Sequence, residues 1–252
     1  MSILLTILGK SPSWQDRDGA CSGYQVELSS GRRLLIDCGN GVFGKLRGVG
    51  EYERIDAVVL SHLHADHMLD LVPFAYVLTY GPQLRSSRPQ LHAPPGARAA
   101  LRRLCGAWGS ETMIENAFEV LEYDPAAELE LLGAQMRFRL VPHYVPSYAM
   151  MLSENGARFA FSADCGPNDE LVELARGAGL LLIEATLAEP DLEDHAHLTA
   201  QEAGEIGRRA GVARLVVTHF SDLLDPAQVR ARAQDAFGGP VELAVEGDTY
   251  EI

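Results

Sequence analysis

Short hydrophobic runs recur along the 252-residue chain, and each is about as long as a β-strand. Some alternate with polar residues and others are continuously apolar. All are bounded by Gly, Pro, Asn or other polar residues, as strands separated by turns are. The predicted strands are ILLTIL (3–8), YQVEL (24–28), RLLIDC (33–38), AVVL (57–60), MRFRLV (136–141), YAMML (148–152), RFAFSA (158–163), LLLIEA (180–185), RLVVTH (214–219) and VELAV (241–245).

Other stretches carry the signals of helices. In LTAQEAGEIGRRAG (198–211), Thr199 is a plausible N-cap with Glu202 three residues later, and the stretch ends in glycine. DPAQVRARAQDAFGG (225–239) begins with Asp-Pro and ends with Gly-Gly, which favours a helix between them. We also expect a helix around 97–108 and another beginning in MLDLVPFAYVLTY (68–80).

The order of these elements indicates an α/β fold with two sheets between helices. The early strands follow one another closely, whereas the later strands alternate with helices, which does not fit one doubly wound sheet. RPQLHAPPGA (88–97) is loop-like but too short to separate two domains, so we expect residues 1–252 to form a single domain. No run of eighteen apolar residues predicts a membrane span. The start, MSILLTILGK, lacks the basic region and the cleavage site of a signal peptide.

Cysteine usage and net charge narrow the expected setting. Cys21, Cys38, Cys105 and Cys165 form no CxxC pair, and without a secretion signal we expect reduced thiols and a cytoplasmic location. The net charge of −14 argues against a broad electrostatic grip on nucleic acid, which needs many lysines and arginines against phosphates.

One basic island interrupts this acidic chain. Residues 72–110 contain no acidic residue but carry five arginines, Arg85, Arg88, Arg98, Arg102 and Arg103. Arginine suits phosphate by its fork geometry, so part of the island could hold a substrate phosphate. Alternatively, the last three arginines line a solvated helix face.

The densest chemistry lies in LSHLHADHMLDL (60–71), directly after a predicted buried strand. His62 and His64 are two positions apart, so in an extended segment they point to the same side and can share one metal ion. Asp66 and His67 follow a turn and suit a second ion nearby. Histidines also cap turns or lie on surfaces, but four candidate ligands within six positions are hard to explain in that way.

Three later residues extend this set. His143, Asp164 and His219 each end a predicted strand or directly follow one, where a rigid scaffold carries functional groups. A lone histidine there is more often a hydrogen-bonded polar residue, but the first motif makes all three candidate ligands. Asp164 could bridge two ions with its two oxygens. Imidazole and carboxylate ligands suit zinc, and also iron or manganese.

With these motifs the chain resembles the metallo-β-lactamase superfamily and, within it, the ribonuclease Z-like branch. The matching motifs are SHLHADH, IDCGNG, PHYVPSY, FSADC, LLIEAT, HLTAQEAG and LVVTHFS, which follow the family order from residue 3 to about 222. The resemblance implies a four-layer αββα sandwich with the site at one edge. It implies seven ligands to two divalent metal ions: His62, His64 and His143 for the first ion, Asp66, His67 and His219 for the second, and Asp164 for both.

The resemblance also implies the roles of an acid–base pair, Glu184 and His197. Two such ions, zinc or alternatively manganese or iron, activate water and stabilise both the entering and the leaving oxygen in a phosphoryl displacement. Asp66 would orient the attacking nucleophile. His197 would donate a proton to the leaving alkoxide, with Glu184 polarising its ring.

Other polar residues receive structural interpretations. His195 is read as exposed or structural, His92 as a loop residue and Cys165 as a packing residue. Residues 39–41 (Gly-Asn-Gly) predict a tight turn that needs positive φ. Asp37 either hydrogen-bonds to the metal ligands or has a purely structural role.

The expected substrate is a small phosphodiester such as a cyclic nucleotide. Members of the branch that cut tRNA precursors carry a long basic arm after the third histidine, but only twenty residues separate His143 from Asp164. DLLD (222–225) also replaces the usual Arg-Tyr pair, and Asp18 stands where Asn follows Arg in tRNA-cutting members. A tRNA 3′-processing endonuclease, a lactone or thioester hydrolase and a non-catalytic binding protein are the alternatives. Relatives are often dimers, so a homodimer stays open.

Overall fold

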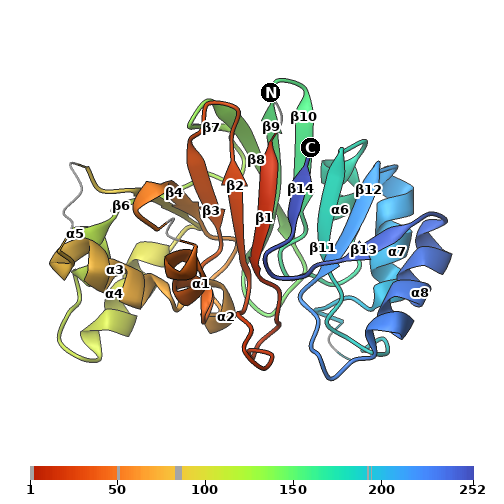
Figure 1. Ribbon diagram of the computed structural model, residues 1–252, viewed down its shortest axis with the longest axis horizontal. Coiled ribbons are helices and arrows are strands. Elements are labelled where there is room, and N and C mark those ends of the chain that lie inside the picture. Colours follow the sequence, from red (N-terminus) through yellow and green to blue (C-terminus); the bar gives the residue numbers. More distant parts are fainter. Residues whose placement is uncertain (1–2, 50–51, 83–86, 192, 194) are drawn as a thin grey trace.

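Two seven-stranded β-sheets stack face to face between two layers of helices (Figure 1). The computed structural model describes residues 3–49, 52–82, 87–191, 193 and 195–252. This arrangement is the αββα sandwich implied by the resemblance. None of the described helices is long and apolar enough to cross a membrane.

The first sheet comes mostly from the first half of the chain. Its strands are β1 (Leu4–Gly9), β2 (Gly23–Glu27), β3 (Arg33–Ile36), β4 (Ile55–Val59), β5 (Gln90–Ala93), β6 (Glu119–Glu122) and β14 (Thr249–Glu251). Their order is β14-β1-β2-β3-β4-β5-β6. The pairs from β14 to β3 are antiparallel, and those from β3 to β6 are parallel.

The second sheet repeats this mixture. Its strands are β7 (Leu129–Leu131), β8 (Ala134–Val141), β9 (Ser147–Glu154), β10 (Ala157–Phe161), β11 (Leu180–Glu184), β12 (Arg214–Thr218) and β13 (Val241–Leu243), in the order β13-β12-β11-β10-β9-β8-β7. The pairs from β7 to β10 are antiparallel, and those from β10 to β13 are parallel.

Helices cover the outer face of each sheet. Those on the first sheet are α1 (Val42–Gly48), α2 (Ala65–Met68), α3 (Leu71–Tyr80), α4 (Ala97–Gly106) and α5 (Met113–Ala117), with a 3₁₀ turn at Tyr52–Arg54. Those on the second sheet are α6 (Asp169–Ala175), α7 (Ala200–Ala210) and α8 (Pro226–Phe237). In Figure 1 the two groups lie on opposite sides of the paired sheets.

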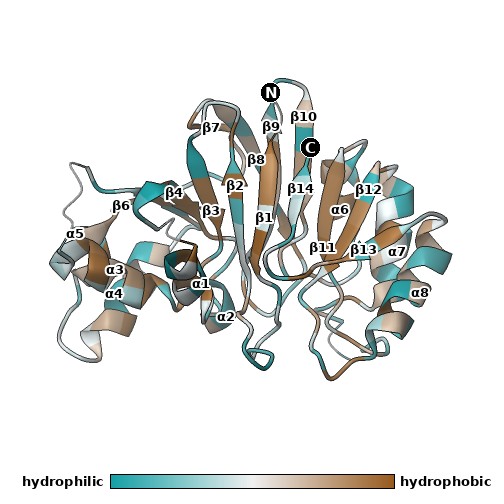
Figure 2. Ribbon diagram, in the orientation of Figure 1, coloured by the Kyte–Doolittle hydropathy of each residue, from teal (hydrophilic) through white to brown (hydrophobic). Residues whose placement is uncertain are grey.

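Three apolar layers hold the sandwich together. The central layer packs side chains of both sheets against each other, including Tyr24, Phe138 and Phe161, and the other two lie between a sheet and its helices. Figure 2 shows that the central strands are strongly hydrophobic. Because strands such as β11 are buried on both faces, they are continuously apolar in the sequence, and their polar residues lie at their ends.

All ten predicted strands and the predicted helices are present. The α7 N-terminus forms a complete capping box between Thr199 and Glu202, and Asp225 caps α8. The stretch 88–97 is a correction, because β5 forms inside it, paired with β4 and β6. Its flanking prolines and glycine conceal a strand of only four residues. Other short elements, β6, β7, α1, α5 and α6, were also not predicted.

Candidate metal centre

Seven side chains converge where strands of both sheets end. His62 and His64 lie in the extended segment after β4, and Asp66 and His67 lie in α2. His143 follows β8, Asp164 follows β10, and His219 follows β12. In Figure 1, α2 lies at the edge of the sandwich opposite both chain termini. All seven residues belong to two groups whose candidate ligand atoms lie within 4.8 Å of one another.

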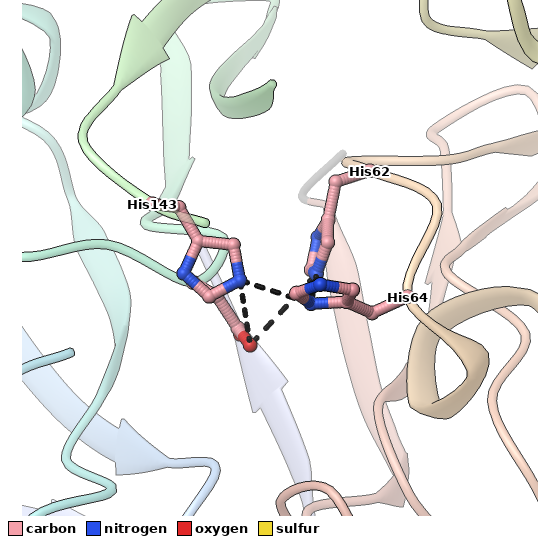
Figure 3. A group of neighbouring side chains, drawn as sticks. His62, His64 and His143 are labelled. Atoms are coloured by element: carbon pink, nitrogen blue, oxygen red, sulfur yellow. Dashed lines mark hydrogen bonds and ion pairs between the residues drawn. The ribbon is translucent and has the colours of Figure 1, made fainter. Parts of the chain in front are cut away.

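The first group contains His62, His64 and His143. The Nδ1 atom of His64 lies 3.2 Å from Nε2 of His62 and 3.0 Å from Nε2 of His143. Figure 3 shows the three rings converging, with His143 on the side opposite His62 and His64. The sequence spacing therefore predicted correctly that His62 and His64 lie together.

The second group contains Asp66, His67 and His219. The Nε2 atoms of the two histidines are 3.3 Å apart. The Oδ2 atom of Asp66 lies 3.5 Å from Nε2 of His67 and 3.3 Å from Nε2 of His219. All three side chains are nearly or fully buried, with Asp66 the most exposed at 10%.

Asp164 connects the two groups with different oxygens. Its Oδ1 lies 3.2 Å from His67 Nε2 and 3.4 Å from His219 Nε2, and its Oδ2 lies 3.9 Å from both His62 Nε2 and His143 Nε2. One carboxylate oxygen therefore faces each group, as a bridging ligand requires.

The donor atoms fit divalent metal ions. Two nitrogens bound tetrahedrally to one zinc ion at 2.0–2.1 Å lie about 3.3 Å apart. The nitrogen–nitrogen separations of 3.0–3.3 Å in both groups match that spacing. These contacts between imidazole nitrogens are poor hydrogen bonds, because most of the nitrogens that face each other carry no hydrogen to donate. The arrangement is compatible with a dinuclear metal site.

The first group is rich in neutral imidazole. Burial lowers the pKa of His62, His64 and His143 below the usual imidazole value. These rings are therefore unprotonated at neutral pH, and their lone pairs are available to a metal ion.

The second group combines histidine with negative charge. Burial opposes a raised pKa at His67, but the charges of Asp164 and Asp37 raise it well above its usual value. Burial would raise the pKa of Asp66, but hydrogen bonds from His219 and His67 lower it. The pKa of Asp164 is likewise lowered, against burial, by the charges of His219 and His67. Ionised carboxylates beside these rings attract a cation.

Outer hydrogen bonds fix the orientation of most of the rings. Asp37 Oδ2 accepts from His67 Nδ1 at 2.8 Å and from the Ser61 hydroxyl at 2.7 Å. Ser61 Oγ in turn accepts from His62 Nδ1 at 3.0 Å, and the carbonyl of Ala196 accepts from His143 Nδ1 at 3.0 Å. Each of these contacts leaves Nε2 facing the metal groups. Asp37 thus hydrogen-bonds to a candidate ligand, which agrees with the first of the two interpretations of this residue.

Thr186 supplies the corresponding contact to His219. Its Oγ1 lies 2.8 Å from His219 Nδ1 and donates to Glu184 Oε2 at 2.7 Å. Ser61, Thr186 and Ala196 were not predicted from the sequence to take part in the site. Ser61 and Thr186 lie within the motifs SHLHADH and LLIEAT, so a hydroxyl beside a candidate site residue was the available signal. A main-chain carbonyl such as that of Ala196 leaves no trace in the sequence.

Glu184, which is buried, and His197, which is partly exposed, form a pair beside both groups. Glu184 Oε1 accepts from His197 Nδ1 at 2.9 Å and from the Cys165 amide at 2.8 Å. The His197 ring lies 4.9 Å from the His143 ring and 5.9 Å from the His219 ring. Burial lowers the pKa of His197, but its hydrogen bond to Glu184 and the charge of that carboxylate raise it to about 9. A ring with this raised pKa carries a proton at neutral pH.

A family model that spans the candidate metal centre identifies the family of this chain. The beta-lactamase superfamily domain matches residues 32–220, which include all seven candidate ligands. The chain belongs to the metallo-β-lactamase superfamily. A protein of Mycobacterium tuberculosis is 34% identical over 261 residues, which cover 100% of this chain and 93% of the relative.

Two further superfamily members carry names that describe a reaction. The metallo-hydrolase YhfI of Bacillus subtilis is 28% identical over 250 residues, 98% of this chain and 99% of the relative. The YhfI crystal structure has a TM-score of 0.89 at 26% identity and covers 100% of this chain and 99% of its own. A ribonuclease Z of Halorubrum lacusprofundi is 28% identical over 308 residues, 100% of this chain and 98% of the relative. The chain is accordingly a metal-dependent hydrolase.

Three arginines of the basic island contact Glu115, and two of them pair with its carboxylate. Arg98 and Arg102 both pair with Glu115 on α5 at 2.7 Å, and Arg88 donates to the carbonyl of Glu115. These contacts favour the interpretation as a solvated helix face. Arg85 lies outside the described residues.

The remaining polar residues have structural partners. His92 is not in a loop, as was expected, but lies on β5, where its Nε2 contacts Gln90 Oε1 at 3.2 Å. His195 pairs with Glu202 of the α7 capping box at 2.7 Å. Cys165 is fully buried, and none of the four cysteines is in a disulfide. The expected turn at 39–41 has positive φ at Gly41.

Proposed function

We propose that this hydrolase is a phosphodiesterase that acts on a small phosphodiester such as a cyclic nucleotide. The observation that carries the proposal is the His197–Glu184 pair, which holds a proton beside the two ligand groups. A diester with an unactivated alkoxide leaving group needs such a donor, because the alkoxide is far too basic to leave unprotonated at neutral pH.

The residues that would hold the metal ions are the seven described above. His62, His64 and His143 would bind one divalent ion, Asp66, His67 and His219 would bind the other, and Asp164 would contact both. When bound, two such ions lower the pKa of water and stabilise negative charge on phosphoryl oxygens. Ligand identity favours zinc, with manganese and iron as alternatives.

The protein side chains then divide the work of proton transfer. The Asp66 side chain is the most exposed of its group, so it would accept a hydrogen bond from the attacking water and orient its lone pair toward phosphorus. The proton that the water loses as it adds to phosphorus would pass along this hydrogen bond to Asp66 and from there to solvent. As the new P–O bond forms, the electron pair of the breaking P–O bond moves to the leaving oxygen. That oxygen takes the proton of His197, and Glu184 stabilises the charged ring until then.

The fold around the site supports a small substrate. β9 and β10 join through a two-residue turn at Asn155 and Gly156, both with positive φ, so the segment between His143 and Asp164 is a plain hairpin. An exposed acid, Asp222, lies on the loop that follows His219, where its charge repels a polyanion.

RNA is the second candidate substrate, because two relatives that align with this chain over nearly their whole length are named ribonuclease Z. The two candidates predict different activities of the same protein. Zinc- or manganese-loaded protein is assayed with 3′,5′-cyclic AMP, bis(p-nitrophenyl) phosphate, a tRNA precursor and a lactone. We expect turnover of both small diesters and at least 1000-fold less with Asp66→Ala, since the attacking water loses its orienting carboxylate. Efficient cleavage of the precursor or of the lactone, with both small diesters untouched, contradicts the proposal.

A further inference from the structure

An exposed tyrosine borders the candidate proton donor. We propose that Tyr144 binds an aromatic ring, such as a nucleobase, on the leaving-group side of the substrate. This inference rests on the proposed phosphodiesterase function and specifies its substrate class. The Tyr144 ring centroid lies 5.3 Å from that of His143 and 6.0 Å from that of His197, and the residue is 57% exposed.

The backbone holds Tyr144 in place. The residue lies between Pro142 and Pro146, in the short connection from β8 to β9, which closes at the Val141–Ser147 pair. Each proline fixes its own φ and restricts the residue before it, so the connection has few conformations. A connection with few conformations costs less entropy when a ligand packs on one of its residues.

The exposure of the site residues shows the side from which a substrate enters. His62 and His67 have no exposed side-chain surface, and Asp164 has 2%. The His197 side chain is 12% exposed and that of Asp66 is 10% exposed, and His64 is also partly exposed, so these residues lie on the accessible side of the site. Tyr144 stands on that side, beside the proton donor. If His197 protonates the leaving oxygen, a group that packs on the neighbouring Tyr144 ring lies on the leaving-group side of the substrate.

The chemistry of this rim suits a ring better than a charge. Lys10 directly follows β1. It pairs with Asp16 and donates to the carbonyl of Phe220, so its charge is already engaged by the protein. An exposed tyrosine offers a large π-face and little charge, and base–aromatic stacking tolerates every base. In a 3′,5′-cyclic nucleotide the leaving oxygen is the ribose 3′-oxygen, and that ribose carries the base.

The test compares two cyclic phosphates that differ only in the ring. One is 3′,5′-cyclic AMP, and the other is the same ribose cyclic phosphate with hydrogen in place of adenine. We expect the wild-type protein to prefer the adenine compound roughly 5- to 100-fold in kcat/KM, the range that one stacked base supplies. Tyr144→Ala should remove most of this preference by raising KM for cyclic AMP, and Tyr144→Phe should retain it.

Matched variants separate this role from a general effect of losing a surface ring. Tyr80→Ala removes an aromatic ring that is 76% exposed on α3, and it should leave the preference unchanged. Metal content and melting temperature of Tyr144→Ala should match the wild type. An unchanged preference in Tyr144→Ala overturns the inference while phosphodiester cleavage stands. If the wild type cleaves no diester, the proposed function and this inference both fall.

Discussion

Asp164 is the residue that the two groups of candidate metal ligands share. It is buried, and each of its oxygens faces a different set of histidines. The surrounding rings are in turn fixed by hydrogen bonds to Asp37, Ser61, Thr186 and the Ala196 carbonyl. Substitutions of these outer partners should therefore alter metal binding without removing any ligand.

Replacement of Asp37 tests this expectation. Asp37→Ala leaves the Nδ1 donors of His67 and, through Ser61, of His62 without an orienting acceptor. We expect metal affinity to fall roughly 10- to 100-fold, measured by competition with a chromophoric chelator. Asp56→Asn is the control. Asp56 also accepts a hydrogen bond from a main-chain amide, that of Arg33, but it lies at the end of β4 that is far from the candidate ligands. Equal affinity in the two variants contradicts the role given to Asp37.

The Glu184–His197 pair predicts a pH dependence. Because the His197 pKa is raised to about 9, the protonated donor is present below that pH and is lost as the pH rises through it. We therefore expect kcat/KM to fall above about pH 9. Glu184→Gln removes the charge that raises the pKa, so this alkaline limb should move toward the unperturbed imidazole value of about 6.5.

The control for this profile is a nearby charge that does not touch His197. Glu189 lies three residues after Thr186 and pairs with Arg232 at the surface. Glu189→Gln should leave the alkaline limb in place, because an exposed charge is screened by solvent. An alkaline limb that stays near pH 9 in Glu184→Gln shows that His197 is not the group that titrates.

Single residues differ in how well the sequence predicts them. The spacing of His62 and His64 identifies a shared site because it converts directly into direction along an extended segment. The approach of His143 and His219 to that segment depends on tertiary structure. Their places at strand ends made them candidates, and only the family resemblance assigned each of them to an ion. His92 shows the limit of local reasoning, since its prolines suggested a loop although long-range pairing makes it part of a strand.

At the scale of elements, the site is assembled from strand ends and the short turns that follow them. Asp37, at the end of β3, begins a turn that holds α2, because the Cys38 amide donates to the carbonyl of His67 and the Asp70 amide donates to that of Cys38. Gly39 lies within this turn. A Cβ atom at Gly39 would stand 1.8 Å from the carbonyl oxygen of Asp66. The turn and α2 can approach this closely only with glycine there.

Two glycine substitutions separate close approach from helix propensity. Gly39→Ala should push α2 away, lower the free energy of unfolding by about 1–3 kcal/mol and weaken metal binding. Gly44→Ala, inside α1 with open space around its Cβ position, should stabilise by up to about 1 kcal/mol. Urea denaturation measures both. A Gly39→Ala protein with native stability and metal affinity contradicts the close approach.

Element prediction succeeded where local signals agree. The strands of the central layer read as apolar runs because they are buried on both faces, and α7 and α8 carry caps at both ends. The missed elements are short, with four residues in β5 and three in β7, and their stability comes from neighbouring strands. A propensity summed over so few residues carries little information.

At the scale of the whole molecule, the candidate ligands link the two sheets. Four of the ligands follow β4 of the first sheet, whereas the other three follow strands of the second sheet: His62, His64, Asp66 and His67, and His143, Asp164 and His219. Ions bound between them hold the halves together only in the folded state. Bound metal should therefore stabilise the fold in proportion to the logarithm of its concentration over its dissociation constant.

Metal removal tests this linkage. We expect the melting temperature to fall by roughly 10 °C when EDTA strips the ions from the loaded protein, given the usual dependence for a chain of this size. His62→Ala should melt lower with metal and respond less to EDTA. A melting temperature that does not depend on metal indicates that no ion joins the sheets.

Anomalous diffraction at the zinc edge, on crystals grown with zinc, tests the dinuclear centre most directly. The account predicts two peaks per chain, one among His62, His64 and His143 and one among Asp66, His67 and His219, with Asp164 in contact with both. Asp164→Ala should weaken or remove at least one peak. A single peak away from these side chains, or no peak, contradicts the central claim.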